Sequence, residues 1–74
     1  MNTKNYAIVI ERGECGGYGA YIPDLPGCVA AGGSEDEVRE RLRGALAMHL
    51  KAMMEDGDAI PEPTTVVEYV ALAS

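Results

Sequence analysis

The sequence contains few side chains that could act as nucleophiles, general bases or metal ligands. Its 74 residues include one histidine, His49, and two cysteines, Cys15 and Cys28. A structural zinc site needs about four such ligands at close spacing, and these three residues are too few and too far apart. Two cysteines also fall short of the disulfide framework of a small secreted domain. We therefore predict reduced cysteines, no metal or cofactor, and a cytoplasmic protein; a Cys15–Cys28 disulfide is conceivable but not predicted.

Catalytic pairs are equally hard to find. His49 falls on or beside an apolar helical stripe, and no serine, cysteine or carboxylate has a spacing that marks it as a catalytic partner. We interpret His49 as a helix-face residue packed at the edge of the core. A metal-dependent nuclease that uses Asp24, Glu11 or Glu68 is a minor alternative, because it would need several carboxylates around one point.

The charge balance restricts the class of partner. The chain has 12 acidic residues against 6 lysines and arginines, a formal net charge of −6. Affinity for a phosphate backbone comes mainly from Lys and Arg, so we predict no direct binding to nucleic acid. An acidic surface suits a basic protein partner or simply solubility. No apolar run approaches the ~20 residues of a membrane span, so we predict no membrane association.

The first half of the chain predicts three strands. Residues 6–12 are β-branched and aromatic, and a glycine-rich turn leads from them to a second strand at 18–22, which predicts a hairpin. The following segment, 23–27, has two prolines that cannot lie inside a central strand. It predicts a tight, stiff connector with Gly27 at positive φ. Small residues at 28–31 then resume an extended conformation.

A helix is predicted over residues 34–56. Ser34 and Glu37 have the spacing of a capping box, and Gly57 is placed to end the helix. Apolar side chains recur at intervals of three and four residues and predict one packed face. The members of this stripe are Val38, Leu42, Ala45, Leu46, His49, Leu50 and Met53.

The segment 64–72 predicts a last strand with two largely apolar sides. The order β-β-β-α-β then gives an α+β, two-layer domain over residues 1–74, with one helix packed on a mostly antiparallel sheet. A single helix covers only one face of that sheet, so we expect a second covering layer from another subunit. We expect a homodimer or higher homo-oligomer, formed through strands or through the uncovered sheet face. The alternative is that the apolar pattern at the chain end has no such role.

Two segments, taken together with their separation in the chain, resemble the HicB-like antitoxin family. They are YGAYIPDLPG, which begins at Tyr18, and GDAIPEP, which begins at Gly57, and the resemblance covers nearly the whole chain. It implies a truncated ribonuclease-H-like fold without clustered metal-binding acids. It also implies an antitoxin that covers the active site of HicA, a small basic ribonuclease that cleaves mRNA with an essential histidine.

The resemblance carries over no site residue directly, so the contact residues are a hypothesis. We nominate Tyr21, Asp24, Leu25 and Glu40 as candidates for contact with the partner. Asp24 is also typical of a turn residue whose side chain bonds the local backbone. Many family members continue into a DNA-binding segment; because the sequence ends at Ser74, we expect a short form to which DNA binding does not transfer. An orphan module that only self-associates is the alternative function.

Overall fold

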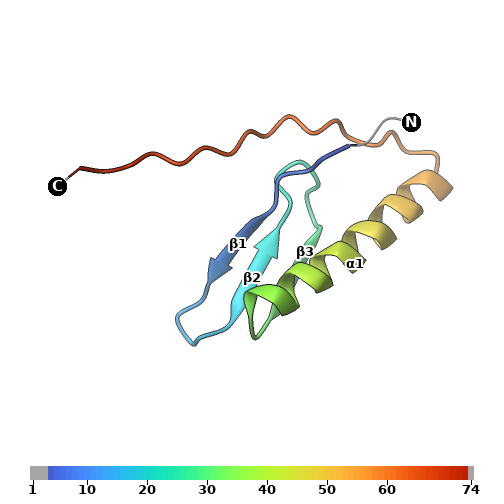
Figure 1. Cartoon of the computed structure of the whole chain (residues 1–74). Coiled ribbons are helices and arrows are strands. Elements are labelled where there is room, and N and C mark those ends of the chain that lie inside the picture. The colour runs from blue at the N-terminus through green and yellow to red at the C-terminus, as the bar shows by residue number, and fades with distance from the viewer. Residues whose placement is uncertain (1–3, 74) are drawn as a thin grey trace.

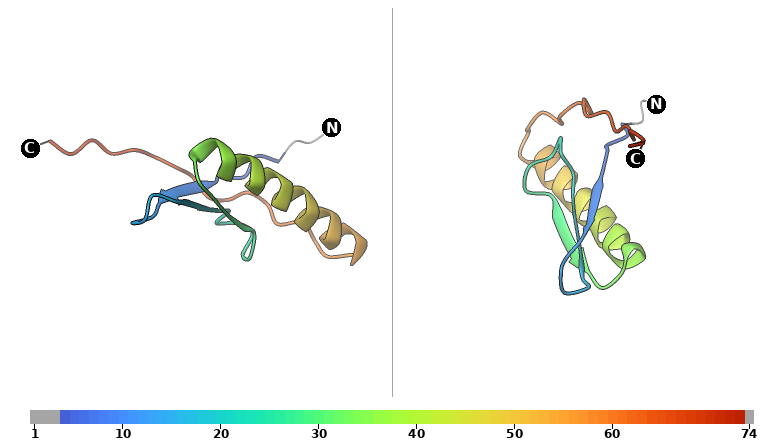
Figure 2. Two further views of the ribbon diagram at one scale, coloured as in Figure 1. Left: turned by 90° about the horizontal axis from the view of Figure 1, so that it is seen from below. Right: turned by 90° about the vertical axis from the view of Figure 1, so that its left-hand side faces the viewer.

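Three short strands and one long helix make up the fold in a computed structural model that describes residues 4–73. The strands are β1 (Val9–Arg12), β2 (Tyr18–Tyr21) and β3 (Val29–Gly32), and the helix is α1 (Glu35–Glu55). The sheet order is β1-β2-β3, and both pairings are antiparallel. The helix lies across one face of the sheet (Figures 1 and 2). The α+β class and the single helix on an antiparallel sheet are confirmed.

The strand register divides the sheet into two different faces. Val9 pairs with Tyr21, and Tyr21 pairs with Val29, so the three side chains form one row across the sheet. Neighbouring residues of a strand point to opposite faces. Since Ala20 and Ile22 are buried in the core with α1, the row through Tyr21 lies on the uncovered face.

The proline-rich connector supplies part of the core. The N–H of Leu25 donates to the Ile22 carbonyl at 3.0 Å, and the N–H of Cys28 donates to the Leu25 carbonyl at 3.1 Å. These bonds fold the connector back on itself, and Gly27 takes the predicted positive φ, 91°. As a result Leu25 points inward and is only 1% exposed. The complete buried set is Ala20, Ile22, Leu25, Cys28, Val38 and Leu42.

Both ends of α1 are capped as local sequence predicts. The hydroxyl of Ser34 accepts from the N–H of Glu37 at 3.1 Å, while the Glu37 carboxylate accepts from the N–H of Gly33 at 2.8 Å. At the other end Gly57 has a φ of 76°, and the N–H of Asp58 reaches back to the Met53 carbonyl at 2.9 Å. This is the pattern of a Schellman motif.

The predicted apolar stripe of α1 faces the sheet. Val38 and Leu42, in the first half of the helix, are buried against β2 and β3. The later apolar members Ala45, Leu46, Leu50 and Met53 are partly buried against the same core, and His49 is half-buried beside them. The stripe is thus confirmed, with its tightest packing near the N-terminus of the helix.

The predicted strand at 64–72 is wrong for this structure. The segment is extended, but no described residue forms a strand ladder with it, and its side chains are exposed. A strand needs a neighbour for its backbone hydrogen bonds, and here none is present among residues 4–73. For the same reason the first strand is shorter than the predicted 6–12, because only residues 9–12 pair with β2.

The two outer strands of the sheet differ at their edges. Arg41 of α1 donates a hydrogen bond of 2.8 Å to the carbonyl of Ala31, on the outer side of β3. On the other side, β1 pairs only with β2 among the described residues. The β3 edge is thus partly occupied by the helix, whereas the β1 edge is open.

Candidate functional site

The four nominated contact residues do not form one site. Tyr21 belongs to the uncovered sheet face, whereas Glu40 is exposed on α1. Leu25 is buried in the core and can influence a binding surface only by holding the connector in place. Asp24, also in the connector, uses its carboxylate to bind another part of this chain. Tyr21 and Glu40 are therefore the two nominated side chains that are available to a partner.

The Asp24 carboxylate holds the beginning of the C-terminal segment. Its Oδ2 accepts the N–H groups of Thr64 at 3.2 Å and Thr65 at 3.1 Å, and its Oδ1 accepts both threonine hydroxyls, at 3.0 and 2.9 Å. The interpretation of Asp24 as a residue that bonds its own turn is wrong, because these partners lie 40 residues away. We call this arrangement the Asp24 clasp.

The clasp shifts the acidity of Asp24. Burial raises the pKa of the carboxyl, but the hydrogen bonds from Thr65 and Thr64 outweigh this effect and hold its pKa below the ordinary value. Such bonds stabilise the ionised carboxylate over the neutral acid. The clasp is therefore strongest at neutral pH, and it weakens once Asp24 becomes protonated.

Two further interactions guide the chain from α1 to the clasp. The Tyr6 hydroxyl donates to the Pro61 carbonyl, and Lys4 forms an exposed ion pair with Glu62. The segment thus crosses the end of the sheet where β1 begins and then reaches the connector. Beyond Thr65 it leaves the body on the β1 side of the sheet (Figure 1). We call residues 66–73 the tail.

The tail carries five of the ten large exposed apolar side chains among residues 4–73. Tyr69 is 96% exposed and Leu72 is 93% exposed, and the other members are Val66, Val67 and Val70. The uncovered sheet face adds Val29, which is 62% exposed, and Tyr21. Extended apolar surface of this kind is characteristic of sites that bind other proteins. Sequence reasoning recognised the apolar pattern of the tail but assigned it to the sheet of its own chain.

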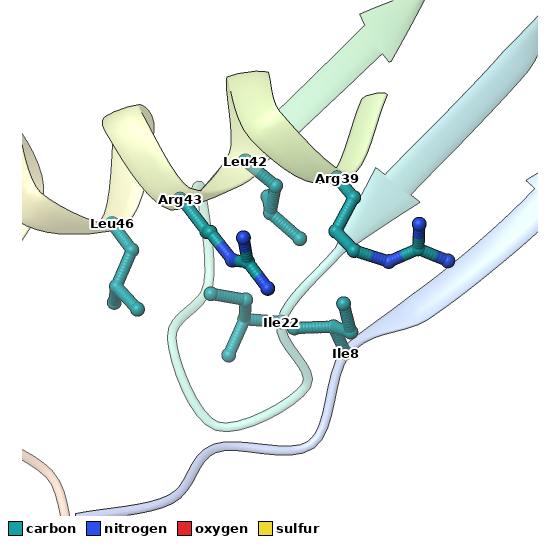
Figure 3. A pocket seen from close by; sticks show the side chains of 6 residues that line it. All are labelled: Ile8, Ile22, Arg39, Leu42, Arg43 and Leu46. Atoms are coloured by element: carbon teal, nitrogen blue, oxygen red, sulfur yellow. The ribbon is translucent and has the colours of Figure 1, made fainter. Parts of the chain in front are cut away.

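A small apolar pocket opens between β1 and α1 (Figure 3). It is lined by Ile8, Ile22, Arg39, Leu42, Arg43 and Leu46. The leucines point from α1 toward the two isoleucines, and the arginines project from the same side of the helix. Its volume, about 30 Å³, is far below the roughly 300–1,000 Å³ of small-molecule sites. The pocket could accept apolar side chains but not a cofactor.

The carboxylates do not assemble into a catalytic centre. Residues 4–73 contain no group of three or more His, Cys, Asp or Glu side chains that could hold a metal ion. Glu11 lies in β1, Asp24 is engaged in its clasp, and Glu68 lies in the tail. This placement gives the nuclease alternative no support.

Acidic side chains instead gather at the two ends of α1. Glu35, Asp36 and Glu37 occupy its first turn, and no basic residue occupies its last turn. Asp36 and Glu40 form exposed ion pairs with Arg39 at 2.9 Å and Arg43 at 3.8 Å. Exposed pairs of this kind contribute little to stability. Asp36 and Glu40 thus stay available to a basic partner, whereas the Glu37 carboxylate is engaged in the helix cap.

The cysteines occupy different environments and are both free. Cys15 is exposed in the turn between β1 and β2, and Cys28 is buried in the core. Burial raises the pKa of the Cys28 thiol, so its reactive thiolate form is suppressed.

The described part of the chain contains no helix with the length and apolar character of a bilayer-spanning segment.

Sequence reasoning missed Thr64, Thr65, Arg39 and Arg43 as parts of binding surfaces. The threonines were assigned to a strand, and nothing near them in the sequence indicates that a carboxylate at position 24 binds them. The arginines fall outside the predicted apolar stripe of the helix, and their role at the pocket depends on the position of β1.

Comparison with known proteins identifies a family. Residues 6–73 match the model of the "HicB_like antitoxin of bacterial toxin-antitoxin system". A UPF0150 protein of Archaeoglobus fulgidus is 44% identical over 57 residues, which cover 74% of this chain and 83% of that protein. No solved structure is significantly similar to the chain.

Two longer relatives match over about half of their own length. Antitoxin HicB 1 of Photorhabdus laumondii is 30% identical over 66 residues, which cover 89% of this chain and 43% of that protein. An uncharacterized 14.9 kDa protein of Haemophilus phage HP1 is 32% identical over 65 residues, covering 88% of this chain and 48% of that protein. These two relatives therefore share nearly all of this chain, which spans only about half of their own length.

Proposed function

We propose a function from the premise that this chain belongs to the HicB-like antitoxin family of bacterial toxin–antitoxin systems: it neutralises a small, basic, HicA-type ribonuclease by covering the active site of that toxin. The observation that carries the proposal is the family match over residues 6–73. Residues 1–74 act in this view as a single HicB-like domain of the cytoplasm, with a binding role and no catalytic step of their own.

The charges of the protein support a basic partner. The net charge is −6, and exposed acids lie at both ends of α1. Opposite charges on two partners accelerate their encounter and favour the correct orientation more than they increase final affinity. The partner would contact exposed groups such as Glu40 and, on the uncovered sheet face, Tyr21.

The test is inhibition of a purified toxin. A short basic protein encoded beside this gene should co-purify with the chain, and its cleavage of mRNA should stop at an equimolar ratio. Glu40→Lys should slow association by about tenfold at low salt, because steering depends on charge. Met48→Lys, at an exposed position of the same helix, is the matched control. Cleavage that continues in the presence of excess chain would refute the proposal.

The alternative function is an orphan module that self-associates without a toxin. The exposed apolar tail favours this alternative, since such a surface seeks a partner. A stable homo-oligomer from which no basic protein can be recovered would support it. A homodimer is compatible with both functions, and the toxin assay distinguishes them.

A further inference from the structure

The open edge of β1 has backbone groups that a further strand could pair with. The N–H of Gly13 donates to the Gly17 carbonyl at 2.7 Å, which continues the register of the β1–β2 ladder. Hydrogen-bonded pairs alternate along an antiparallel ladder. The N–H and C=O groups of Ile10 and Arg12 therefore point away from β2. An open edge of this kind can accept a strand from another chain.

The pocket lies beside this same edge. Ile8, immediately before β1, forms one wall of it, and Leu42 and Leu46 of α1 form the other. A strand added to β1 would place every second side chain over the pocket. Val66, Val70 and Leu72 have this spacing in the tail, and all three are exposed in the single chain. The tail therefore has the apolar pattern that the pocket can accept.

Charge indicates which side of the tail faces the helix. Glu68 lies on the same side of the extended tail as Val66 and Val70. Arg39 and Arg43, two of the six lysines and arginines in the chain, line the pocket. Glu68 would meet these arginines when its neighbours cover the pocket. Asp36 and Glu40 already pair with these arginines at the surface, so Glu68 would join two existing exposed ion pairs, and an acidic strand is compatible with the charges at this place.

The tail is poorly suited to turn back onto its own β1. The Asp24 clasp fixes Thr64 and Thr65, and Pro63 precedes them. Residues 64–67 are all β-branched, and residues 62–73 contain no glycine. β-Branched residues favour extended backbone, whereas tight turns favour Gly, Asn, Asp and Pro. The chain therefore continues away from the body, as it does in Figure 1, which leaves its backbone groups open to pairing with a different molecule.

We propose that residues 66–72 of one copy pair with the open edge of β1 in a second copy, in a reciprocal strand exchange that makes a two-fold dimer. Val66, Val70 and Leu72 lie on the side of the added strand that covers the pocket of the other copy, and Glu68 lies against its Arg39 and Arg43. The other side of the added strand, Val67, Tyr69 and Ala71, extends the uncovered sheet face. This specifies the homodimer considered above and does not depend on the toxin.

Complementation between two variants tests the exchange. Val70→Asp gives a tail that cannot fill the pocket, and Ile8→Asp gives a pocket that cannot accept a tail. Each variant alone should lose the dimer in light-scattering measurements of mass at micromolar concentrations. An equimolar mixture should recover a dimer, because one intact tail then meets one intact pocket. Met48→Asp, at an exposed position of α1, is the matched control and should remain dimeric.

A charge exchange avoids the risk that Ile8→Asp simply unfolds the protein. Arg43→Glu and Glu68→Arg both change exposed side chains. Each single variant should weaken the dimer, and their mixture should restore it in part. In the wild-type dimer the N–H of Ile10 should also be protected from hydrogen exchange.

Three results would overturn the exchange. They are a monomeric wild-type protein, mixtures that stay as monomeric as their components, and a tail that becomes protected only when a basic protein is added. Because these measurements use the pure chain, their failure is distinct from failure to inhibit a toxin.

Discussion

The connector around Leu25 and the tail around Leu72 contain similar apolar residues but have opposite environments. Leu25 is almost fully buried, and Leu72 is almost fully exposed. The connector is closed by its own hydrogen bonds and lies beneath α1. The tail has no such local bonds and extends from a single clasp. The comparison shows that apolar residues become core only where the chain also supplies a surface to cover them.

The largest effect is expected from a large-to-small substitution in the core, compared with one in the tail. Leu42→Ala, in the core beneath α1, should lower the free energy of unfolding by about 2–5 kcal/mol. That is a large share of the roughly 5 kcal/mol expected of so small a domain. Val70→Ala should change the melting temperature only at concentrations where copies associate. Thermal unfolding followed by circular dichroism over a range of concentrations measures both.

If Val70→Ala lowered the melting temperature equally at all protein concentrations, the tail would be packed on its own chain. An unchanged melting temperature for Leu42→Ala would mean that α1 does not cover the sheet in solution. Met48→Ala, on the exposed side of the same helix, is the control for helix propensity. The partly buried Leu46 and Leu50 should give smaller losses than Leu42.

Two glycines, one in the connector and one in α1, allow the backbone of these two elements to be compared. Gly27 has positive φ in the connector, and open space surrounds the position where its Cβ would lie. Gly27→Ala should therefore cost about 1 kcal/mol from backbone strain alone. Gly44 lies in α1 with equally open space, and Gly44→Ala should stabilise by about 0.5–1 kcal/mol. Urea unfolding measures both, and two changes of the same sign would contradict this reading of the backbone.

The smallest effect on global stability is expected from the clasp. Asp24→Asn should release Thr64 and Thr65 and increase the mobility of the tail, seen as sharper amide NMR signals or faster proteolysis there. The wild-type clasp should persist above the ordinary Asp pKa and be lost as the pH falls through the lower pKa of the folded protein. The variant should lack this pH dependence.

Glu62→Gln is the matched control for the clasp. It breaks the exposed ion pair with Lys4 in the same segment, and its cost should stay below about 1 kcal/mol. A tail that is equally ordered in Asp24→Asn and in wild type would show that the clasp does not hold it.

Local signals in the sequence determined most of the body. The helix caps at Ser34 and Gly57, the positive φ at Gly27 and the apolar stripe of α1 could all be predicted, because each depends on residues a few positions apart. The conformation of residues 64–72 could not be predicted in this way, since a strand forms only where another strand pairs with it. The Asp24 clasp could not be predicted either, because the aspartate and Thr64 are 40 residues apart in the sequence.

The hydrogen bond from Arg41 to the Ala31 carbonyl has a consequence for how large an assembly can grow. A sheet that is open on both sides can recruit chain after chain and polymerise into filaments. With this guanidinium bound to a carbonyl of the β3 edge, pairing of another strand with that edge is hindered. In a reciprocal pair both tails and both β1 edges are used, so no tail remains to recruit a third molecule, and the arginine would hinder further growth at β3.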